Sequence, residues 1–507
     1  MKVAVVGSGA AAAGVLKGLE RFAPAGVAIT LFDIGAAMED PPPSVAAQGY
    51  VRETLAPIYR RLHAQHGLVA FPPPKSHFGQ SLTKLTVEGK PLLWKSEHRG
   101  GLTNVWGGGM FPFTDRELAG WPVSAAELDR YYRIMAEEVG VCGEPDALDA
   151  YFTHDYVNRP ALRTSPVVEA LRDTTNRHGA AGGRGYRLVA GASRLALETR
   201  AGHAHACTYS GECMLGCPRE SIWSASQSLD RWQARRFIAE SVGARVTRVG
   251  NGTVHFRRTD AADAPAEQLG GFDRIFLAAG CIGTTEIAMR SLGLTRGPAL
   301  LDNAVLSFPI LYLGGGVRDA EGGGYFSLCN LSMMGVPDDP AEAAAQVSVY
   351  PAFDHLWRYY TPEPLWQAMQ PLWREGRWRF LLGRVFLAGS ANRTLSFELV
   401  NDRLELRRGD AADVRTPARR FMRSLRRAVN HGGFYVPPVQ PGGHGTSSHY
   451  AATLPYGGAL VDVARHGRIA PGVHLADAST FVGSPAISPT FTIMANACRT
   501  VYESLQD

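Results

Sequence analysis

Three cysteines in the middle of the chain have a spacing that suits metal chemistry. Cys207, Cys213 and Cys217 follow the pattern C-x5-C-x3-C, and Pro218 comes directly after them. A bacterial ferredoxin segment has the pattern C-x2-C-x2-C-x3-C-P, so Ser210 stands here where that segment has its second cysteine. Because the loss of one thiolate leaves one iron corner without its ligand, the spacing predicts a [3Fe–4S] cluster.

Two other interpretations of this segment stay open. His203 and His205 lie just upstream, so a Cys3His zinc site is also compatible with the sequence, as is a purely structural Gly-Cys-Pro turn with packed thiols. A disulfide framework is disfavoured, because the chain has seven cysteines, an odd number, and three of them are crowded together. We expect the remaining four to be buried small residues: Cys142, Cys281, Cys329 and Cys498.

The first 33 residues have the order of elements that positions a dinucleotide. An apolar strand over residues 3–6 leads into a glycine-rich turn, a helical stretch through Leu19 and a second strand over residues 27–32, which ends at Asp33. The order of strand, glycine turn, helix, strand and acid is typical of a nucleotide-binding unit. It does not distinguish NAD from FAD.

Five residues of this unit have predicted roles. Gly7 permits the tight turn, and Gly9 lets the backbone approach a pyrophosphate at the positive end of the helix. Ala12 and Gly14 allow the helix to pack closely on the strand. Asp33 follows at the distance at which an acid accepts a hydrogen bond from a ribose hydroxyl.

Later segments extend this pattern along the whole chain. A glycine loop, a strand with a glycine turn, a histidine segment and two C-terminal segments occur in this order: Gly100–Gly108, Ile275–Thr285, Ser448–Gly457, Leu475–Phe481 and Ser488–Arg499. With these motifs the chain resembles the glucose–methanol–choline (GMC) family of FAD-dependent oxidoreductases. The resemblance implies an α/β fold in which a Rossmann-like FAD-binding domain is interleaved with an α+β substrate-binding domain.

The resemblance also implies domain bounds and cofactor contacts. Residues 1–110, 195–300 and 441–507 would form the FAD-binding domain, and residues 111–194 and 301–440 the substrate-binding domain. Asp477 could accept from a flavin-linked hydroxyl, cap a helix, or do both, and the glycines of the loop leave room for a flat ring system. Besides the residues of the first unit, the implied FAD-binding residues are Gly100, Gly101, Thr103, Asn104, Gly107, Ala279, Gly280, Asp477, Ala478, Pro489 and Thr490.

The histidine segment implies the catalytic base. In the family that it resembles, a base removes the hydroxyl proton of an alcohol while hydride passes from the carbinol carbon to the flavin. His449 matches that base, and histidine has a pKa near working pH. His444 is a nearby alternative that matches less well, and His449 could instead be a surface-loop residue. Ser488 replaces the family's usual second histidine or asparagine; it can hydrogen-bond a substrate oxygen but cannot act as a base near neutral pH.

The cysteine segment resembles that of the family's cluster-bearing bacterial sugar dehydrogenases. The resemblance implies oxidation of a sugar or related alcohol, with electrons passing through the cluster to an external cytochrome or quinone, and with a small carrier subunit as a further partner. The chain has no C-x-x-C-H haem motif, so the next carrier would be another molecule. A steroid, a terpenoid or a long-chain alcohol stays open as substrate. As functions, an oxygen-using oxidase, a flavin-fold lyase and a non-catalytic binding protein stay open.

Composition narrows the class further. The 507 residues, of which 45% are hydrophobic and 20% charged, can form a large core, which excludes a disordered chain. No apolar run is long enough for a transmembrane helix, and the N-terminus lacks the full pattern of a secretory signal. The net charge of +5 comes without a nucleic-acid-reading motif, so we expect no nucleic-acid partner. We expect a cytoplasmic protein, or a periplasmic or membrane-associated one only if a partner subunit carries it.

Overall fold

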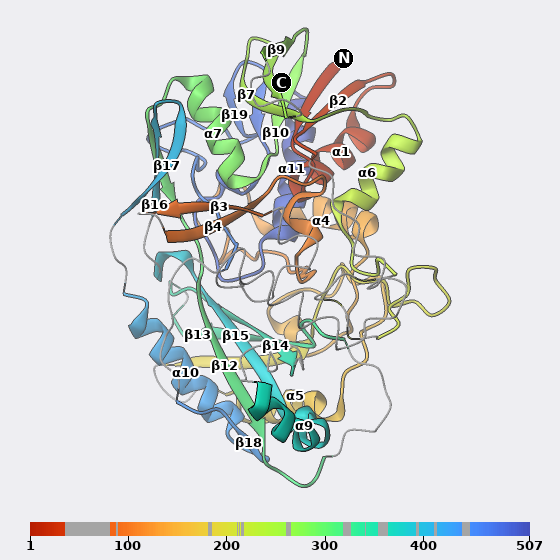
Figure 1. Cartoon of the computed structure of the whole chain (residues 1–507), viewed down its shortest axis with the longest axis vertical. Coiled ribbons are helices and arrows are strands. Elements are labelled where there is room, and N and C mark those ends of the chain that lie inside the picture. The colour runs from red at the N-terminus through yellow and green to blue at the C-terminus, as the bar shows by residue number, and fades with distance from the viewer. Residues whose placement is uncertain are drawn as a thin grey trace.

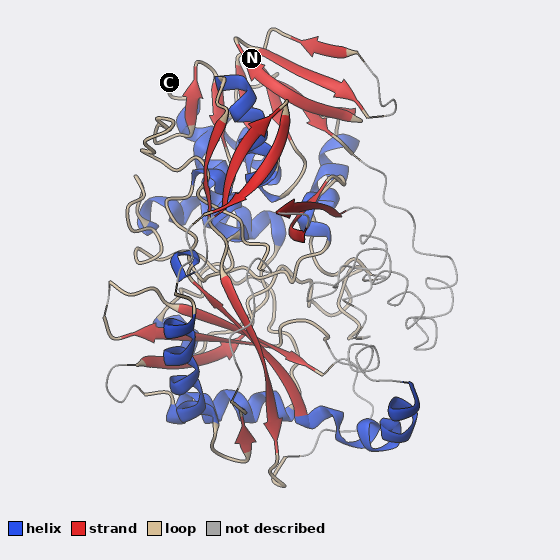
Figure 2. Cartoon of the chain, turned by 60° about the vertical axis from the view of Figure 1, so that its left-hand side comes forward, coloured by secondary structure: helices blue, strands red, loops and turns tan. Residues whose placement is uncertain are grey.

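One largely parallel sheet and one antiparallel sheet organise the chain in the computed structural model (Figure 1, Figure 2). Both termini lie at the end of the molecule that holds the parallel sheet (Figure 1). This arrangement confirms the predicted α/β fold class. The structure describes residues 1–35, 82–87, 90–180, 185–209, 211, 213, 217, 219–259, 265–317, 326–339, 341–352, 363–391, 395–409, 413–438 and 447–507.

The first sheet has the strand order β19-β20-β10-β1-β2-β6. All neighbours are parallel except β19 and β20, which are antiparallel. After Lys2, strand β1 is a run of four buried apolar residues, as expected for a parallel strand that is covered on both faces. Segments from the start, middle and end of the chain are therefore neighbours: β1 (Lys2–Val6), β2 (Ala28–Asp33), β6 (Ala239–Val242), β10 (Arg274–Leu277), β19 (Arg468–Ala470) and β20 (Val473–Leu475).

Among the described residues, five helices belong to this half of the molecule. Helices α1 and α4 both pack against α11, and they also contact each other. Helix α4 lies within the segment 111–194 but packs in the core of the first sheet, and the domain bounds themselves stay a prediction. The helices are α1 (Ala10–Phe22), α4 (Ala125–Val139), α6 (Ala225–Ala234), α7 (Gly280–Leu292) and α11 (Thr490–Ser504).

Three small antiparallel units and five 3-10 turns complete the described part of the chain. The first unit is a hairpin of β3 (Leu82–Val87) and β4 (Lys90–Ser96). The second is a three-stranded sheet of β7 (Ala244–Gly250), β8 (Thr253–Arg258) and β9 (Ala266–Leu269). The third is a three-stranded sheet of β11 (Arg296–Leu300), β16 (Leu395–Val400) and β17 (Arg403–Arg408). The 3-10 turns are η1 (Gly101–Asn104), η2 (Ala147–Ala150), η3 (Arg377–Arg379), η4 (Gly389–Ala391) and η5 (Ala478–Thr480).

The second large sheet is antiparallel and has the order β18-β12-β15-β14-β13-β5. Its strands are β5 (Tyr186–Ala192), β12 (Ala304–Tyr312), β13 (Leu331–Pro337), β14 (Ala345–Pro351), β15 (Phe380–Leu387) and β18 (Phe434–Tyr435). One face is apolar and packs with helices α5 (Pro166–His178) and α10 (Arg415–Val429). Helix α9 (Glu363–Gly376) lies at the far end of this half (Figure 1). Across the described ranges, every helix is too short or too polar to cross a membrane.

Candidate functional site

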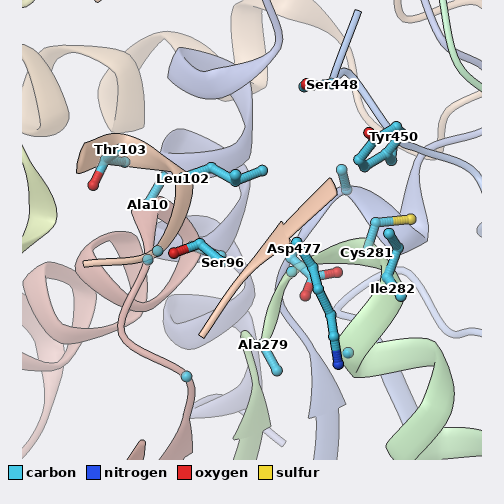
Figure 3. A pocket seen from close by; sticks show the side chains of 18 of the residues that line it. Ala10, Ser96, Leu102, Thr103, Ala279, Cys281, Ile282, Ser448, Tyr450 and Asp477 are labelled. Carbon is cyan, nitrogen blue, oxygen red and sulfur yellow. The ribbon is translucent and has the colours of Figure 1, made fainter. Parts of the chain in front are cut away.

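A cavity of about 580 Å³ extends from the turn after β1 to the antiparallel sheet. Figure 3 shows part of it, with Leu102 and Thr103 of η1 on one side and Ala279, Cys281 and Asp477 on the other. Most of the predicted cofactor and catalytic residues line this cavity: Gly7, Gly9, Asp33, Gly101, Thr103, Gly107, Ala279, Gly280, His449, Asp477, Ala478, Ser488, Pro489 and Thr490. The structure thus brings both ends of the chain and its middle to one site.

The turn after β1 has the backbone that the sequence predicts. Gly7 has a φ of +102°, and a Cβ there would stand 2.4 Å from the carbonyl oxygen of Ala278, so only glycine fits. Gly9 is the N-cap of α1, and a Cβ there would meet only Gly100 and Gly101, both at 3.9 Å, among the described atoms. Because the first N–H groups of a helix lack intrahelical partners, this end of α1 suits an anion.

Two of the predicted residues, Ala12 and Gly14, belong to helix α1 but do not line the cavity. A Cβ on Gly14 would stand 2.4 Å from the carbonyl oxygen of Met494, so Gly14 allows α1 to approach α11. The sequence analysis expects Gly14 to let the helix pack closely on the strand. The close contact is instead between two helices, α1 and α11. Ala12 is fully buried in the same core.

Asp33 ends β2 with one carboxylate oxygen ready for a ligand. The side chain is 8% exposed, and its Oδ1 accepts a hydrogen bond from the Gly35 N–H at 2.8 Å. Its Oδ2 is buried and has no hydrogen-bond partner within the described part of the chain. Burial raises the pKa of this carboxyl to about 6. An acceptor that is buried and unpaired beside a glycine turn fits a ribose hydroxyl, as the sequence predicted.

The glycine loop around η1 is held by hydrogen bonds on the side away from the cavity and is open on the side that faces it. The Thr103 hydroxyl donates to the Gly100 carbonyl at 2.5 Å, and the Asn104 amide donates to the Arg99 carbonyl at 2.8 Å. Gly100 has a φ of +94° and receives support from Ser8, whose hydroxyl accepts from the Gly100 N–H at 3.0 Å. The sequence did not single out Ser8. Asn104 and Gly100 therefore hold the loop in place rather than line the cavity.

Gly107 provides the open side of this loop. It lines the cavity, and no described atom lies within 4 Å of the position that its Cβ would take. An added side chain would therefore extend into space that a ligand could use. The predicted approach of backbone to a flat ring system fits this position.

Asp477 has the capping role that the sequence allowed. Its Oδ1 accepts from the Ser479 N–H at 3.0 Å and caps η5, while its Oδ2 accepts from the Thr284 hydroxyl at 2.5 Å. The residue is 2% exposed, and burial raises the pKa of its carboxyl. Since Asp477 also lines the cavity, the two predicted roles remain compatible. Ala279 and Gly280 begin α7 at the same wall.

His449 is oriented by a residue that the sequence analysis missed. Asn303 donates from Nδ2 to the carbonyls of Ser484 and Pro485 at 3.0 and 2.9 Å, so its Oδ1 is assigned as an acceptor. This Oδ1 lies 2.9 Å from His449 Nδ1. Nδ1 therefore carries the proton, and Nε2 is the basic nitrogen. Asn303 stands far from His449 in sequence and precedes a strand, so no local pattern marks it.

The surroundings of His449 keep its imidazole uncharged. The ring stacks on Phe386 with centroids 4.9 Å apart and planes at 19°. Loss of solvent, with a further contribution from Arg384, lowers the pKa of His449 to about 3. At neutral pH the side chain is thus uncharged. Its pKa is lower than the sequence analysis expects of the base, because burial removes water from the imidazole. His444 lies outside the described residues.

Ser488 lies at the start of α11, where its backbone and side chain both contact Gln346. The Ser488 N–H donates to Gln346 Oε1 at 2.8 Å, and its hydroxyl oxygen lies 3.4 Å from the same atom. Pro489 and Thr490 follow, and they open α11 toward the cavity. Gln346 is 1% exposed on β14 and was not foreseen from the sequence. Ser488 and His449 thus line the same cavity from different segments.

The three clustered cysteines are free thiols beside the cavity. Cys213 is buried, while Cys207 and Cys217 are half-buried. The Tyr209 N–H donates to the Cys207 sulfur and the Ser221 N–H to the Cys217 sulfur, both at 3.4 Å. Considering only the described residues, no three or more His, Cys, Asp or Glu side chains form a group that could hold a metal ion. Ser210 and Pro218 lie outside them.

The other four cysteines are buried, as predicted. Two of them, Cys281 and Cys329, also line the cavity. His203 and His205, which a zinc site would use, are exposed. The His205 ring instead lies 2.8 Å from the Arg219 carbonyl through Nδ1.

Two solved structures share this fold at low sequence identity. Pyridoxine 4-oxidase from Mesorbium loti aligns with a TM-score of 0.61 and 14% identity over 100% of this chain and 99% of that chain. An FAD-dependent oxidoreductase from Chaetomium thermophilum, solved in complex with a fragment, aligns with a TM-score of 0.59 and 13% identity over 99% of both chains. No protein-family model and no curated protein matches the chain. The likeness over the full length confirms the fold.

Proposed function

We propose that the protein is an FAD-dependent dehydrogenase that oxidises a hydroxyl group of a sugar or related alcohol to a carbonyl. The observation that carries this proposal is the position of a neutral, oriented His449 in the same cavity as the dinucleotide turn with Gly9 and Asp33. The names of the two solved structures, an oxidase and an FAD-dependent oxidoreductase, support flavin chemistry on this fold.

In the proposed reaction, each of these cavity residues would have a separate role. FAD, when bound, supplies the acceptor for the substrate's hydride. His449 takes the hydroxyl proton at Nε2 while the carbinol carbon gives up hydride, so the alcohol loses two electrons and two hydrogens and becomes a carbonyl. Asn303 holds the imidazole in the required tautomer through Nδ1. Ser488, held by Gln346, hydrogen-bonds the substrate oxygen.

The residues present fit FAD at several points. The Asp33 Oδ2 atom would accept from a ribose hydroxyl, and the N-terminus of α1 at Gly9 would face the pyrophosphate. Gly107 leaves open space for the ring system. Asp477, already engaged by Thr284, forms the opposite wall.

Anaerobic mixing with alcohols tests the proposed reaction. The holoprotein is mixed with sugars, polyols, primary alcohols and sterols, and the flavin absorbance is followed. We expect at least one sugar or polyol to bleach the flavin and to yield the matching carbonyl compound. If no alcohol bleaches the flavin, the proposed reaction is excluded in favour of a lyase or a binding protein.

An oxygen-using alcohol oxidase is the second candidate, because one of the two solved structures that share the fold is named as an oxidase. The same preparation separates the two functions. Stoichiometric peroxide formation in air would identify an oxidase. Slow reaction with oxygen and fast turnover with a one-electron acceptor would identify a dehydrogenase.

We further propose that electrons leave through a [3Fe–4S] cluster held by Cys207, Cys213 and Cys217, toward an external cytochrome or quinone. Three free thiols from one segment, two of which accept backbone N–H groups, have the donor chemistry of such a cluster. Cys213 belongs to the same apolar cluster as Leu195, and Leu195 lines the cavity. Because the described residues do not bring three such donor side chains together into a group that could hold a metal ion, the proposal rests on the spacing of the cysteines in the sequence.

Replacing Cys213 with serine is expected to separate substrate oxidation from electron export. The variant should lose its iron and the EPR signal of an oxidised [3Fe–4S] cluster, because a hydroxyl is a poor substitute for thiolate as an iron ligand. Bleaching of the flavin by substrate should persist, while reduction of a one-electron acceptor should fall. Cys142→Ser, at another buried thiol, is the matched control and should keep its iron. A wild-type protein with flavin but no iron would refute the cluster.

Replacing Asp33 with alanine is expected to weaken FAD binding roughly tenfold to a hundredfold, the value of a hydrogen bond to a charged group.

The pKa of about 6 for Asp33 also predicts that the affinity for FAD depends on pH. The carboxylate is the better acceptor, so wild-type affinity should be highest above pH 6 and should fall as the pH drops through 6. Asp33→Asn keeps the shape without the titration, so its affinity should stay flat between about pH 5 and 7. FAD release measured by fluorescence checks both variants, and a similar pH dependence in Asp33→Asn would contradict the assignment.

A further inference from the structure

A serine with left-handed backbone directly precedes the proposed base. Ser448 has a φ of +62°, a conformation that residues other than glycine, asparagine and aspartate rarely adopt. Such a residue persists only where its surroundings hold it, and residues of this kind gather at functional sites. The contacts of the neighbouring residues must therefore keep Ser448 in this conformation.

Hydrogen bonds fix the chain on both sides of Ser448. Before it, the Ser447 hydroxyl donates to Asp302, and the oxygen of the same hydroxyl accepts from the His449 N–H at 2.9 Å. After it, the His449 carbonyl accepts from the Ser484 hydroxyl at 3.3 Å. Because these bonds hold both neighbours, Ser448 cannot relax to an ordinary φ without breaking them.

A tight turn does not account for this conformation. Among the described residues other than glycine that have a positive φ, Asp402 and Ser448 line the cavity. Asp402 belongs to the two-residue turn between β16 and β17, and hairpin turns of this length favour positive φ values. Ser448 lies outside any hairpin, in the segment that carries His449.

The left-handed residue brings two neighbouring side chains to one cavity. In extended backbone the side chains of Ser448 and His449 would point in opposite directions. Here both residues line the cavity, and Figure 3 shows Ser448 among the side chains of its wall. Ser448 is half-buried, and its hydroxyl has no hydrogen-bond partner in the part of the chain that the structure describes. A hydroxyl can donate one hydrogen bond and accept two, so this group is available to a ligand.

We propose that the Ser448 hydroxyl binds a second hydroxyl of the substrate, next to the one that is oxidised, and that the substrate is therefore a vicinal diol. This inference rests on the proposed oxidation at His449 and narrows its substrate class. Consecutive Cα atoms are about 3.8 Å apart, so the two side chains can reach oxygens on neighbouring carbon atoms of one substrate. Ser448 is thus a specificity-determining residue.

Matched alcohols test this inference on the holoprotein. Propylene glycol is compared with propanol, a cyclohexanediol with cyclohexanol, and glucose with deoxyglucose. Anaerobic stopped-flow measurement of flavin bleaching gives the rate and the half-saturating concentration for each. We expect at least one diol to react roughly threefold to tenfold more efficiently than its partner, the value of one hydrogen bond between neutral groups.

Ser448→Ala should remove this advantage and leave the reaction of the matched monoalcohol unchanged. Alanine fits the backbone, because Ala452 has a φ of +65° in the same segment. Ser448→Gly is the second variant. Glycine adopts a positive φ without strain, so this variant should keep or raise the Tm and still lose the preference for the diol.

Ser332→Ala is the matched control. Ser332 also lines the cavity, but its hydroxyl lies 3.1 Å from the Ser193 hydroxyl and 3.7 Å from the Cys329 sulfur, so its removal should leave the preference for the diol unchanged. Equal reaction of diol and monoalcohol in every wild-type pair, or a preference that persists in both Ser448 variants, would overturn the inference. So would an equal loss with both alcohols of a pair. Failure of all alcohols to bleach the flavin would instead overturn the proposed oxidation, so the two failures are distinguishable.

Discussion

His449→Ala is expected to lower the rate of flavin reduction by substrate about a thousandfold, the size of a general-base contribution. The imidazole is the neutral base of the cavity, held through Nδ1 by Asn303 and stacked on Phe386. Its replacement leaves the substrate proton without an acceptor at that position. Anaerobic stopped-flow measurement of flavin bleaching gives the rate directly, and FAD content shows whether the site is still assembled.

His474→Ala is the matched control for this prediction. His474 is 1% exposed, and burial lowers its pKa to about 4, but it lies on β20 beside Phe276, outside the cavity lining. Its replacement should alter stability while leaving the rate constant of the bound protein nearly unchanged. An equal loss of rate in both variants, or an unchanged rate in His449→Ala, would exclude His449 as the base.

The pH dependence gives a second measure of the same residue. A base must be unprotonated to act, and the pKa of His449 lies near 3. The reduction rate should therefore not fall between about pH 8 and 5, whereas an ordinary histidine with a pKa of about 6.5 would lose most of its activity there. A midpoint near 6.5 in the wild type would contradict this assignment.

Gly7→Ala is expected to destabilise the protein by about 3 kcal/mol or more, from backbone strain and overpacking together. An alanine there would have to adopt a φ of +102° and place its Cβ 2.4 Å from the Ala278 carbonyl oxygen. Both atoms belong to the parallel sheet and its first turn, so neither moves without disturbing β1 and β10. Thermal unfolding of the purified protein measures the loss.

Gly9→Ala makes the informative comparison. Its Cβ would meet only Gly100 and Gly101 atoms at an ordinary distance of 3.9 Å, as far as the described residues show. The fold should therefore tolerate the change, while the added methyl group takes space on the cavity wall and weakens FAD binding. Similar unfolding temperatures for both variants would contradict the geometry of the turn.

Local sequence patterns predict a structural feature when all the residues that form it lie in one segment. The turn from Gly7 to Asp33 is such a segment, because strand, glycines, helix and acid follow one another directly. The structure places Gly9 and Asp33 at the cavity as expected. Gly14 differs in its partner, since α11 lies almost a whole chain length away in sequence and nothing local shows that it packs there.

Residues that act across segments escaped prediction. Asn303 and Gln346 look like ordinary polar positions in or near apolar strands. The position of Gln346 depends on the register of the antiparallel sheet, which pairs it with Phe386, whereas the position of Asn303 depends on the packing of the segment around Ser484. A single sequence does not reveal that register, because loops of different length connect these strands.

The order of strands in the parallel sheet determines how late in synthesis this sheet can be completed. Strand β1 lies between β2 and β10, and β10 in turn pairs with β20, so the sheet joins the first and the last parts of the polypeptide. Helix α1 packs on α11, which the ribosome makes long after α1. The nascent chain must therefore hold its glycine turn without these partners through most of translation, a period in which exposed apolar strands favour aggregation. FAD added during refolding should therefore raise the yield of folded protein, by binding the state in which these distant segments have met.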